Sequence, residues 1–160
     1  MHTRRAMEPL EQLISKSEIE RLRSTYDSNV FLTANRRAFA TAYPPLAVFA
    51  EAAGSLLSAE TPIEPKVREL CLITLLAYRS PGLSLATHVY WGLMEGVTLQ
   101  QVCHAASFAG CYGGLPQLAT SLLAINRTLL VLKRLANEST VRGSEAVLTA
   151  LAHEFAGVDV

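Results

Sequence analysis

The stretch that decides the fold is PKVRELCLITLLAYRSPGLSLATHVYWGLMEGVTLQQV, residues 65–102 of this 160-residue chain. Residues 66–78 are apolar on nearly every side, which is typical of a helix buried at the centre of a fold. Pro65 suits the first turn of that helix, because a first-turn residue needs no backbone N–H. The sequence RSPGL then breaks the helix, and we expect the next one to run from about Ser84 to Glu95.

Turn and cap signals divide the rest of the chain into further helices. Gly96 is placed to end the second helix as its C-terminal cap. Thr98 and Gln101 have the spacing of a capping box, which predicts that another helix begins there. The glycine-rich sequence GCYGGLP predicts a tight corner, after which Pro116 opens a long helix. The helices expected outside the first stretch span residues 33–43, 46–57, 98–109, 116–133 and 144–156.

Together these signals predict an all-α protein of about seven helices. An alternating strand pattern of useful length is missing, and the best candidate, NVFLT at residues 29–33, is short. We expect residues 1–28 to form a polar N-terminal arm that packs on a neighbour or frays, and residues 29–160 to form the helical domain. Two or three helices are too apolar for a monomer to cover fully, which favours a homo-oligomer.

Composition and charge argue against several classes of function. The formal net charge is zero, so nothing predicts a general attraction to nucleic acid or to an anionic membrane. The longest apolar run, residues 70–78, is far shorter than the roughly 18 residues of a membrane span. The N-terminus lacks the apolar segment of a secretory signal. We therefore expect a cytoplasmic protein.

The cysteines give no sign of a disulfide framework or a metal site. Cys71, Cys103 and Cys111 make an odd count without CxxC spacing, which argues against paired disulfides and structural zinc. A reducing cytoplasm fits this pattern. We expect the three to act as small buried hydrophobic residues.

His88 is the first candidate for chemistry. Histidine is the side chain best suited to exchange a proton near neutral pH. Ser84, Trp91 and Gly92 share its helix face, where tryptophan offers an apolar wall and glycine leaves room beside the imidazole. The alternatives are a buried histidine bonded to a backbone carbonyl and, for Ser84, an N-cap rather than a nucleophile. Weaker candidates are His2, His104 and His153.

Glu69 is the second candidate, because it lies near the start of the most apolar helix. A carboxylate that faces a core needs a partner or a raised pKa. The alternatives are a salt bridge with Arg68 or Arg127, or exposure at the helix N-terminus. In an ideal antiparallel hairpin that turns near residue 81, Glu69 and His88 miss each other by roughly 8 Å along the axis. Sequence spacing therefore leaves open whether they meet.

The ordered set of these residues resembles the carboxymuconolactone decarboxylase family, within the alkylhydroperoxidase D-like (AhpD-like) fold. The resemblance rests on Arg68-Glu69-Leu70, on His88 nineteen residues after the glutamate, on the closing GVT, and on Tyr112-Gly-Gly-Leu-Pro116 before another helix. It covers about residues 30–130. It implies an all-α bundle that forms trimers or hexamers, with the site between helices near subunit contacts and with no cofactor.

Two departures from the family pattern narrow the expected chemistry. The redox branch has a CxxC ahead of the histidine, where this chain has Pro81 and Ser84, so we do not expect a thiol peroxidase. The decarboxylase branch often has Tyr-Glu where this chain has Leu83-Ser84. Glu69, His88 and Tyr112 carry over from the family, which suggests a related pocket with a different substrate.

The resemblance thus implies a cofactor-free lyase or isomerase that acts on a small lactone or cyclic carboxylic acid through an enolate-like intermediate. His88 is expected as the catalytic proton donor, and Glu69 is expected to orient it or relay its proton. Ser84, Trp91 and Tyr112 are expected to bind the substrate, and no cofactor or metal is expected. Decarboxylation, isomerisation and dehydration remain open, as does a non-catalytic oligomer of the same fold that binds a ligand or partner.

Overall fold

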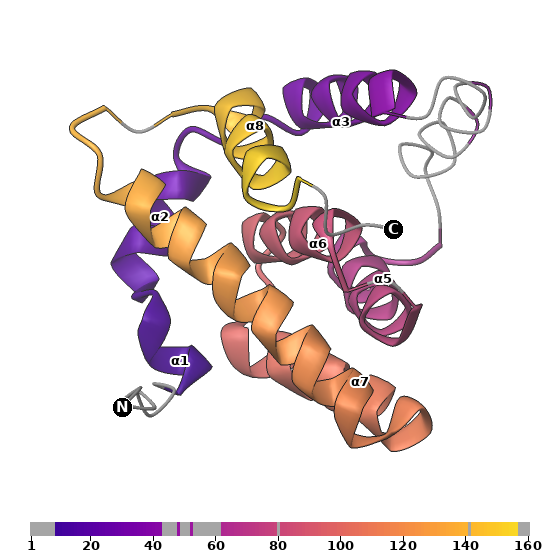
Figure 1. The fold of residues 1–160 in the computed structure, drawn as a ribbon. Helices are drawn as coiled ribbons and strands as arrows, with labels where there is room; N and C mark the ends of the chain where they lie inside the picture. Colours follow the sequence, from indigo (N-terminus) through magenta and orange to yellow (C-terminus); the bar gives the residue numbers. More distant parts are fainter. Residues whose placement is uncertain are drawn as a thin grey trace.

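The computed structural model describes residues 9–42, 48, 52, 62–79, 81–140 and 142–156. Within these ranges the regular structure is entirely helical, which confirms the all-α expectation (Figure 1). The helices are α1 (Leu10–Leu13), α2 (Lys16–Arg23), α3 (Ser28–Ala42), α5 (Pro65–Arg79), α6 (Leu83–Met94), α7 (Leu99–Ala136) and α8 (Ser144–Glu154). The helix expected at 46–57 falls on residues of which only 48 and 52 are described.

The central helix is α6, not α5 as the sequence suggested. Between residues 85 and 94 every α6 residue except His88 is buried, and α6 packs against α2, α5, α7 and α8. Helix α5 begins at Pro65 as expected, but it buries only the stripe Glu69, Ile73 and Ala77. Its opposite face holds apolar side chains that are exposed in the single chain, including Leu75 at 62 %. A helix that is apolar all round does not reveal which face its own chain covers.

The C-terminus of α6 ends in the glycine cap that the sequence predicts. Gly96 has φ +89°, a conformation that glycine adopts without steric cost. The N–H of Val97 donates to the carbonyl of Gly92 at 2.8 Å, and the N–H of Gly96 donates to that of Leu93 at 3.3 Å, which together form a Schellman motif. The guanidinium of Arg23 in α2 also donates to the Leu93 carbonyl, at 2.6 Å.

Helix α7 is bent into two halves at the predicted glycine-rich corner. It begins at the predicted capping box of Thr98 and Gln101, and Gly114, at φ 82° and ψ 175°, interrupts it. The first half continues past the expected end at Ala109 up to this kink. Gly110 lies close to the second half, since a Cβ built there would be 2.8 Å from the Cβ of Leu118. Figure 1 shows the two halves running back beside each other from this corner.

By length and composition alone, α7 would be able to cross a membrane, although core helices of soluble proteins meet the same two criteria. The non-helical residue Gly114 divides this helix, and both halves have buried residues that pack within the chain. The second half is tied to α5, because Gln117 and Ser121 both donate to the carbonyl of Ala77, at 2.6 and 2.7 Å.

The N-terminal segment differs from the expected arm. Its residues from 10 to 23 form α1 and α2, which pack on α7 and α6, with Leu22 fully inside the core. Helix α3 begins at Ser28 rather than near residue 33, because the Asp27 carboxylate accepts the N–H groups of Asn29 and Val30 as an N-cap. The strand candidate NVFLT is therefore helical.

Candidate functional site

Glu69 and His88 meet within one chain. Glu69 lies on the inward stripe of α5 and is 0 % exposed. One of its carboxylate oxygens, Oε2, is 2.8 Å from Nδ1 of His88. The other, Oε1, accepts a hydrogen bond from Nε of Arg68 at 3.0 Å. The question left open by sequence spacing is thus answered by direct contact between the two side chains.

Gly92 explains how the two helices bring these side chains together. A Cβ built at Gly92 would be 3.3 Å from Ile73, 3.4 Å from Val97 and 3.5 Å from the Cβ of Glu69. The space left by this glycine is therefore taken by α5 and Val97, and not by free volume beside the imidazole as we expected. Glu69 lies level with Gly92, so its offset from His88 is one helical turn, about 5.4 Å. The side chains of Glu69 and His88 are long enough to span this offset, which is smaller than the roughly 8 Å expected for an ideal antiparallel hairpin.

Trp91 backs the pair on the side of the core. Its ring is nearly parallel to that of His88, with centroids 5.7 Å apart and an interplanar angle of 22°. The guanidinium carbon of Arg68 lies 4.8 Å from the same ring centroid. Because Trp91 is only 2 % exposed, it has little surface left for a substrate, and its visible role is to support His88 and Arg68.

The partners of Glu69 determine which nitrogen of His88 is available for chemistry. When Glu69 is ionised its carboxylate only accepts hydrogen bonds, and Nδ1 of His88 is then the nitrogen that carries the proton donated to it. That arrangement leaves Nε2 as the ring nitrogen that is not bound to Glu69. The His88 side chain is 12 % exposed, so the imidazole lies at the edge of the fold and not deep inside it.

Two predicted substrate-binding residues have different surroundings from Trp91. Ser84 lies inside the first turn of α6 and is not its N-cap, because that position is Gly82, which makes no side-chain cap. Tyr112 is 85 % exposed near the corner of α7. Among the residues that the structure describes, no hydrogen bond or ring contact connects Ser84 or Tyr112 with His88.

The sequence reasoning missed two residues behind Trp91. The indole N–H of Trp91 donates to Oε1 of Glu95 at 3.2 Å, and the hydroxyl of Tyr26 lies 3.5 Å from the same oxygen. Burial, followed by the charge of Glu95, raises the pKa of Tyr26. The i+4 spacing from Trp91 to Glu95 was a usable signal, whereas nothing near Tyr26 in the sequence pointed to α6. The second arginine considered for Glu69, Arg127, instead pairs with Glu154 at 3.0 Å.

Metal-ligating side chains do not gather in the described part of the chain, where no group of three or more His, Cys, Asp or Glu residues is placed to hold an ion.

The expectation that the cysteines are small buried residues was wrong for Cys71 and Cys111, which are exposed, while Cys103 is intermediate. Cys71 lies on the uncovered face of α5, and Cys111 lies near the corner of α7. Both positions are exposed although the sequence around them is apolar.

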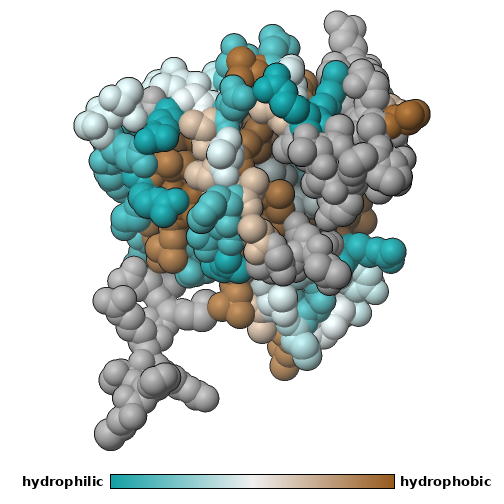
Figure 2. Space-filling model, turned by 45° about the horizontal axis from the view of Figure 1, so that its top comes forward, coloured by the Kyte–Doolittle hydropathy of each residue, from teal (hydrophilic) through white to brown (hydrophobic). Residues whose placement is uncertain are grey.

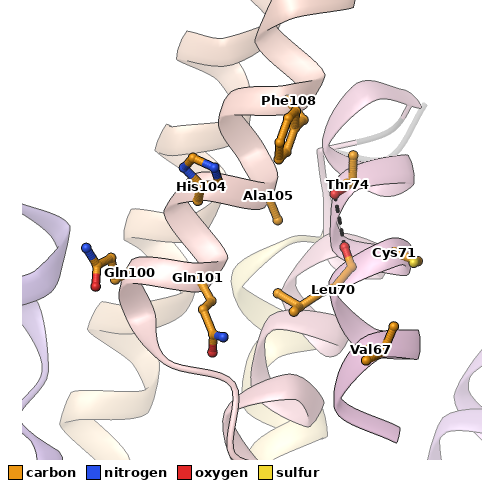
Figure 3. Close-up of a pocket in the computed structure, with 9 residues that line it drawn as sticks. All are labelled: Val67, Leu70, Cys71, Thr74, Gln100, Gln101, His104, Ala105 and Phe108. Carbon is orange, nitrogen blue, oxygen red and sulfur yellow. Dashed lines mark hydrogen bonds between the residues drawn. The ribbon is translucent and has the colours of Figure 1, made fainter. Parts of the chain in front are cut away.

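A separate groove of about 480 Å³ runs between α5 and the first half of α7 (Figure 3). Leu70 from α5 faces Ala105 and Phe108 from α7 across it. Its lining includes no charged Asp, Glu, Lys or Arg side chain, and neither Glu69 nor His88 borders it. The lining residues are Val67, Leu70, Cys71, Thr74, Gln100, Gln101, His104, Ala105 and Phe108.

Comparisons of this chain with protein-family models, with curated proteins and with solved structures give no match.

Proposed function

We propose that this protein is a cofactor-free lyase or isomerase that acts on a small lactone or cyclic carboxylic acid, with His88 as proton donor and Glu69 as its orienting partner. The observation that carries the proposal is the 2.8 Å contact between the buried Glu69 carboxylate and Nδ1 of His88. A carboxylate in this place selects the tautomer of the imidazole and stabilises its protonated form.

The proposed step is the loss of CO2 from the substrate, followed by transfer of a proton from His88 to the same substrate. The bond between the ring carbon and its carboxylate breaks, and its electron pair moves into the conjugated lactone carbonyl to give an enolate. His88 then delivers the proton on Nε2 to carbon and regains one from water at its exposed edge. Isomerisation uses the same donor, because it also passes through an enolate-like state.

We also propose that the chain adopts the AhpD-like bundle, works in the cytoplasm and assembles into a trimer or hexamer. The support for self-association is the outward face of α5, where the side chains at every helical turn are apolar and exposed: Val67, Cys71, Leu75 and Tyr78. This stripe lies opposite the buried stripe of the same helix. Figure 2 shows apolar residues reaching the surface in separate patches on the face drawn.

The alternative function is a non-catalytic oligomer that binds a ligand or partner. The observation in its favour is the groove between α5 and α7, which has an uncharged lining and lies apart from His88. The two functions predict that a bound ligand shields different residues from solvent. A ligand in the groove would shield Leu70 and Phe108, whereas a substrate of the enzyme would shield His88.

The test is turnover of a panel of small unsaturated lactone acids, followed by CO2 release and by loss of ultraviolet absorbance. We expect His88→Gln to lower kcat about 100-fold or more, because a general acid contributes roughly 10²–10⁴ in rate. The matched control is His153→Gln, an exposed histidine on α8 that should keep full activity. Full activity of His88→Gln would refute the role of His88, and lack of turnover across the panel would favour the binding function.

A further inference from the structure

The edge of the Trp91 indole is held by a carboxylate at the end of its own helix. Oε1 of Glu95 accepts the indole N–H at 3.2 Å, and the Tyr26 hydroxyl lies 3.5 Å from that same oxygen. Glu95 follows the last residue of α6, where Gly96 and Val97 close the helix with backbone hydrogen bonds. The carboxylate is therefore fixed at its root by the helix cap and at its tip by an aromatic N–H.

The faces of the same indole are also occupied. Phe31 of α3 approaches to 4.7 Å between ring centroids, Arg68 lies over the ring, and His88 stacks on it at 22°. A stacked ring follows the plane of its neighbour. The orientation of the His88 imidazole is thus determined from two directions, by Glu69 at Nδ1 and by the plane of Trp91.

We infer that Glu95 is a positioning residue for His88, acting through the indole of Trp91. By holding the indole N–H, Glu95 fixes the plane against which His88 stacks, and this plane aims Nδ1 at Glu69 and Nε2 away from it. Within the described part of the chain, the charged groups in contact with the two rings include Arg68 and Glu69 from α5 and Glu95 at the end of α6, and the neutral hydroxyl of Tyr26 lies beside Glu95. The effect of Glu95 on catalysis rests on the proposed function, whereas its effect on the orientation of His88 does not.

Trp91 makes the inference testable without a substrate, because it is the only tryptophan in the chain. An imidazolium in contact with an indole quenches its fluorescence more strongly than a neutral imidazole does. We expect the emission of the wild-type protein to fall in one step as acid protonates His88, and His88→Gln to abolish that step. Glu95→Ala should reduce the amplitude of the step at least twofold, whereas Glu95→Gln, which keeps an acceptor for the indole N–H, should retain it.

A second readout is the tautomer of His88 in long-range ¹H–¹⁵N spectra of the imidazole. We expect a single Nδ1–H form in the wild type and in Glu95→Gln, and a mixture of tautomers in Glu95→Ala. The matched control is Glu145→Ala, an exposed carboxylate on α8 that should leave both readouts unchanged, and far-UV circular dichroism reports whether each variant is folded. A wild-type quenching step together with a wild-type tautomer in folded Glu95→Ala would overturn the inference.

The two proposals fail in different ways. If Glu95→Ala changes the fluorescence step and the tautomer while no lactone acid is turned over, the positioning role stands and the proposed function falls. If the wild type turns over a lactone acid and Glu95→Ala keeps its kcat and its tautomer, the positioning role falls alone. If both proposals hold, Glu95→Ala should lower kcat about tenfold with a smaller change in KM, and Glu95→Gln should restore most of it.

Discussion

At the scale of single residues, the site is a buried carboxylate with two cationic or proton-donating partners. Glu69 has no exposed surface, so its charge depends on Arg68 and His88 for compensation. Sequence patterns singled out Glu69, His88 and Trp91, because an acidic residue in an apolar helix and a histidine that shares a helix face with a tryptophan are local signals. Tyr26 and Glu95 act from behind Trp91, and a contact of that kind depends on tertiary packing, which local spacing does not encode for Tyr26.

Tyr26 gives a prediction for the dependence of stability on pH. Burial and the nearby Glu95 raise its pKa, so the folded state keeps the phenol proton after the unfolded chain, with a tyrosine pKa of about 10, has lost it. This contribution to stability is complete below about pH 10 and is lost as the pH rises further. We expect the urea midpoint of the wild type to fall more between pH 8 and about pH 11 than that of Tyr26→Phe. Parallel curves would contradict the prediction, and Tyr90, whose pKa burial also raises, should leave part of the slope in the variant.

At the scale of secondary-structure elements, end signals were more informative than hydrophobicity. The capping box at Thr98, the glycine cap at Gly96 and the corner near Pro116 were all predicted from the sequence and are present. The start of α3 was predicted five residues too late, at residue 33, because the β-branched and aromatic residues of NVFLT also suit a strand, although Asp27 before them is a strong N-cap residue. The sequence predicted α5 as the central buried helix, but α6 takes that place, because burial depends on which helices surround each one.

Gly110 provides a prediction at this scale. Alanine there would place a Cβ 2.8 Å from the Cβ of Leu118, so the two halves of α7 would have to separate at the corner. We expect Gly110→Ala to lower the free energy of unfolding by about 1–3 kcal/mol, the usual cost of overpacking, despite the better helix propensity of alanine. Urea unfolding measures the change, with the exposed residue Cys111→Ala as the control on the same half of the helix. A variant as stable as the wild type would show that the corner opens without cost.

At the scale of the whole molecule, the chain buries one continuous core around α6 and leaves the outward stripe of α5 uncovered. The all-α class followed from the sequence because helical periodicity and caps occur throughout. The inclusion of α1 and α2 in the folded unit did not, since residues 10–23 are mostly polar and, among those whose burial is described, only Leu13, Ile14 and Leu22 are buried. Three buried residues within a polar segment are too weak a pattern to distinguish a packed helix pair from a loose arm.

The uncovered stripe yields the prediction for assembly. Leu75 is 62 % exposed at its middle, and we expect Leu75→Glu to reduce the mass in solution to that of one chain, 17.4 kDa, with unchanged helix content. Light scattering after size-exclusion chromatography measures this mass. Leu123→Glu, at another exposed leucine that lies on α7 and is 54 % exposed, serves as the control and should keep the assembly. A wild-type protein of 17.4 kDa in solution would contradict self-association through this face.

The two faces of α5 have a consequence for communication across the molecule. Leu75 and Glu69 lie on opposite faces of the same helix, so a displacement of α5 caused by a partner at Leu75 would also move the backbone of Glu69. The 2.8 Å contact with His88 tolerates displacements of only a few tenths of an ångström before it weakens. A partner on the outer face that displaced α5 would therefore act on the Glu69–His88 contact, and by thermodynamic reciprocity a change in that contact would act on the affinity for the partner.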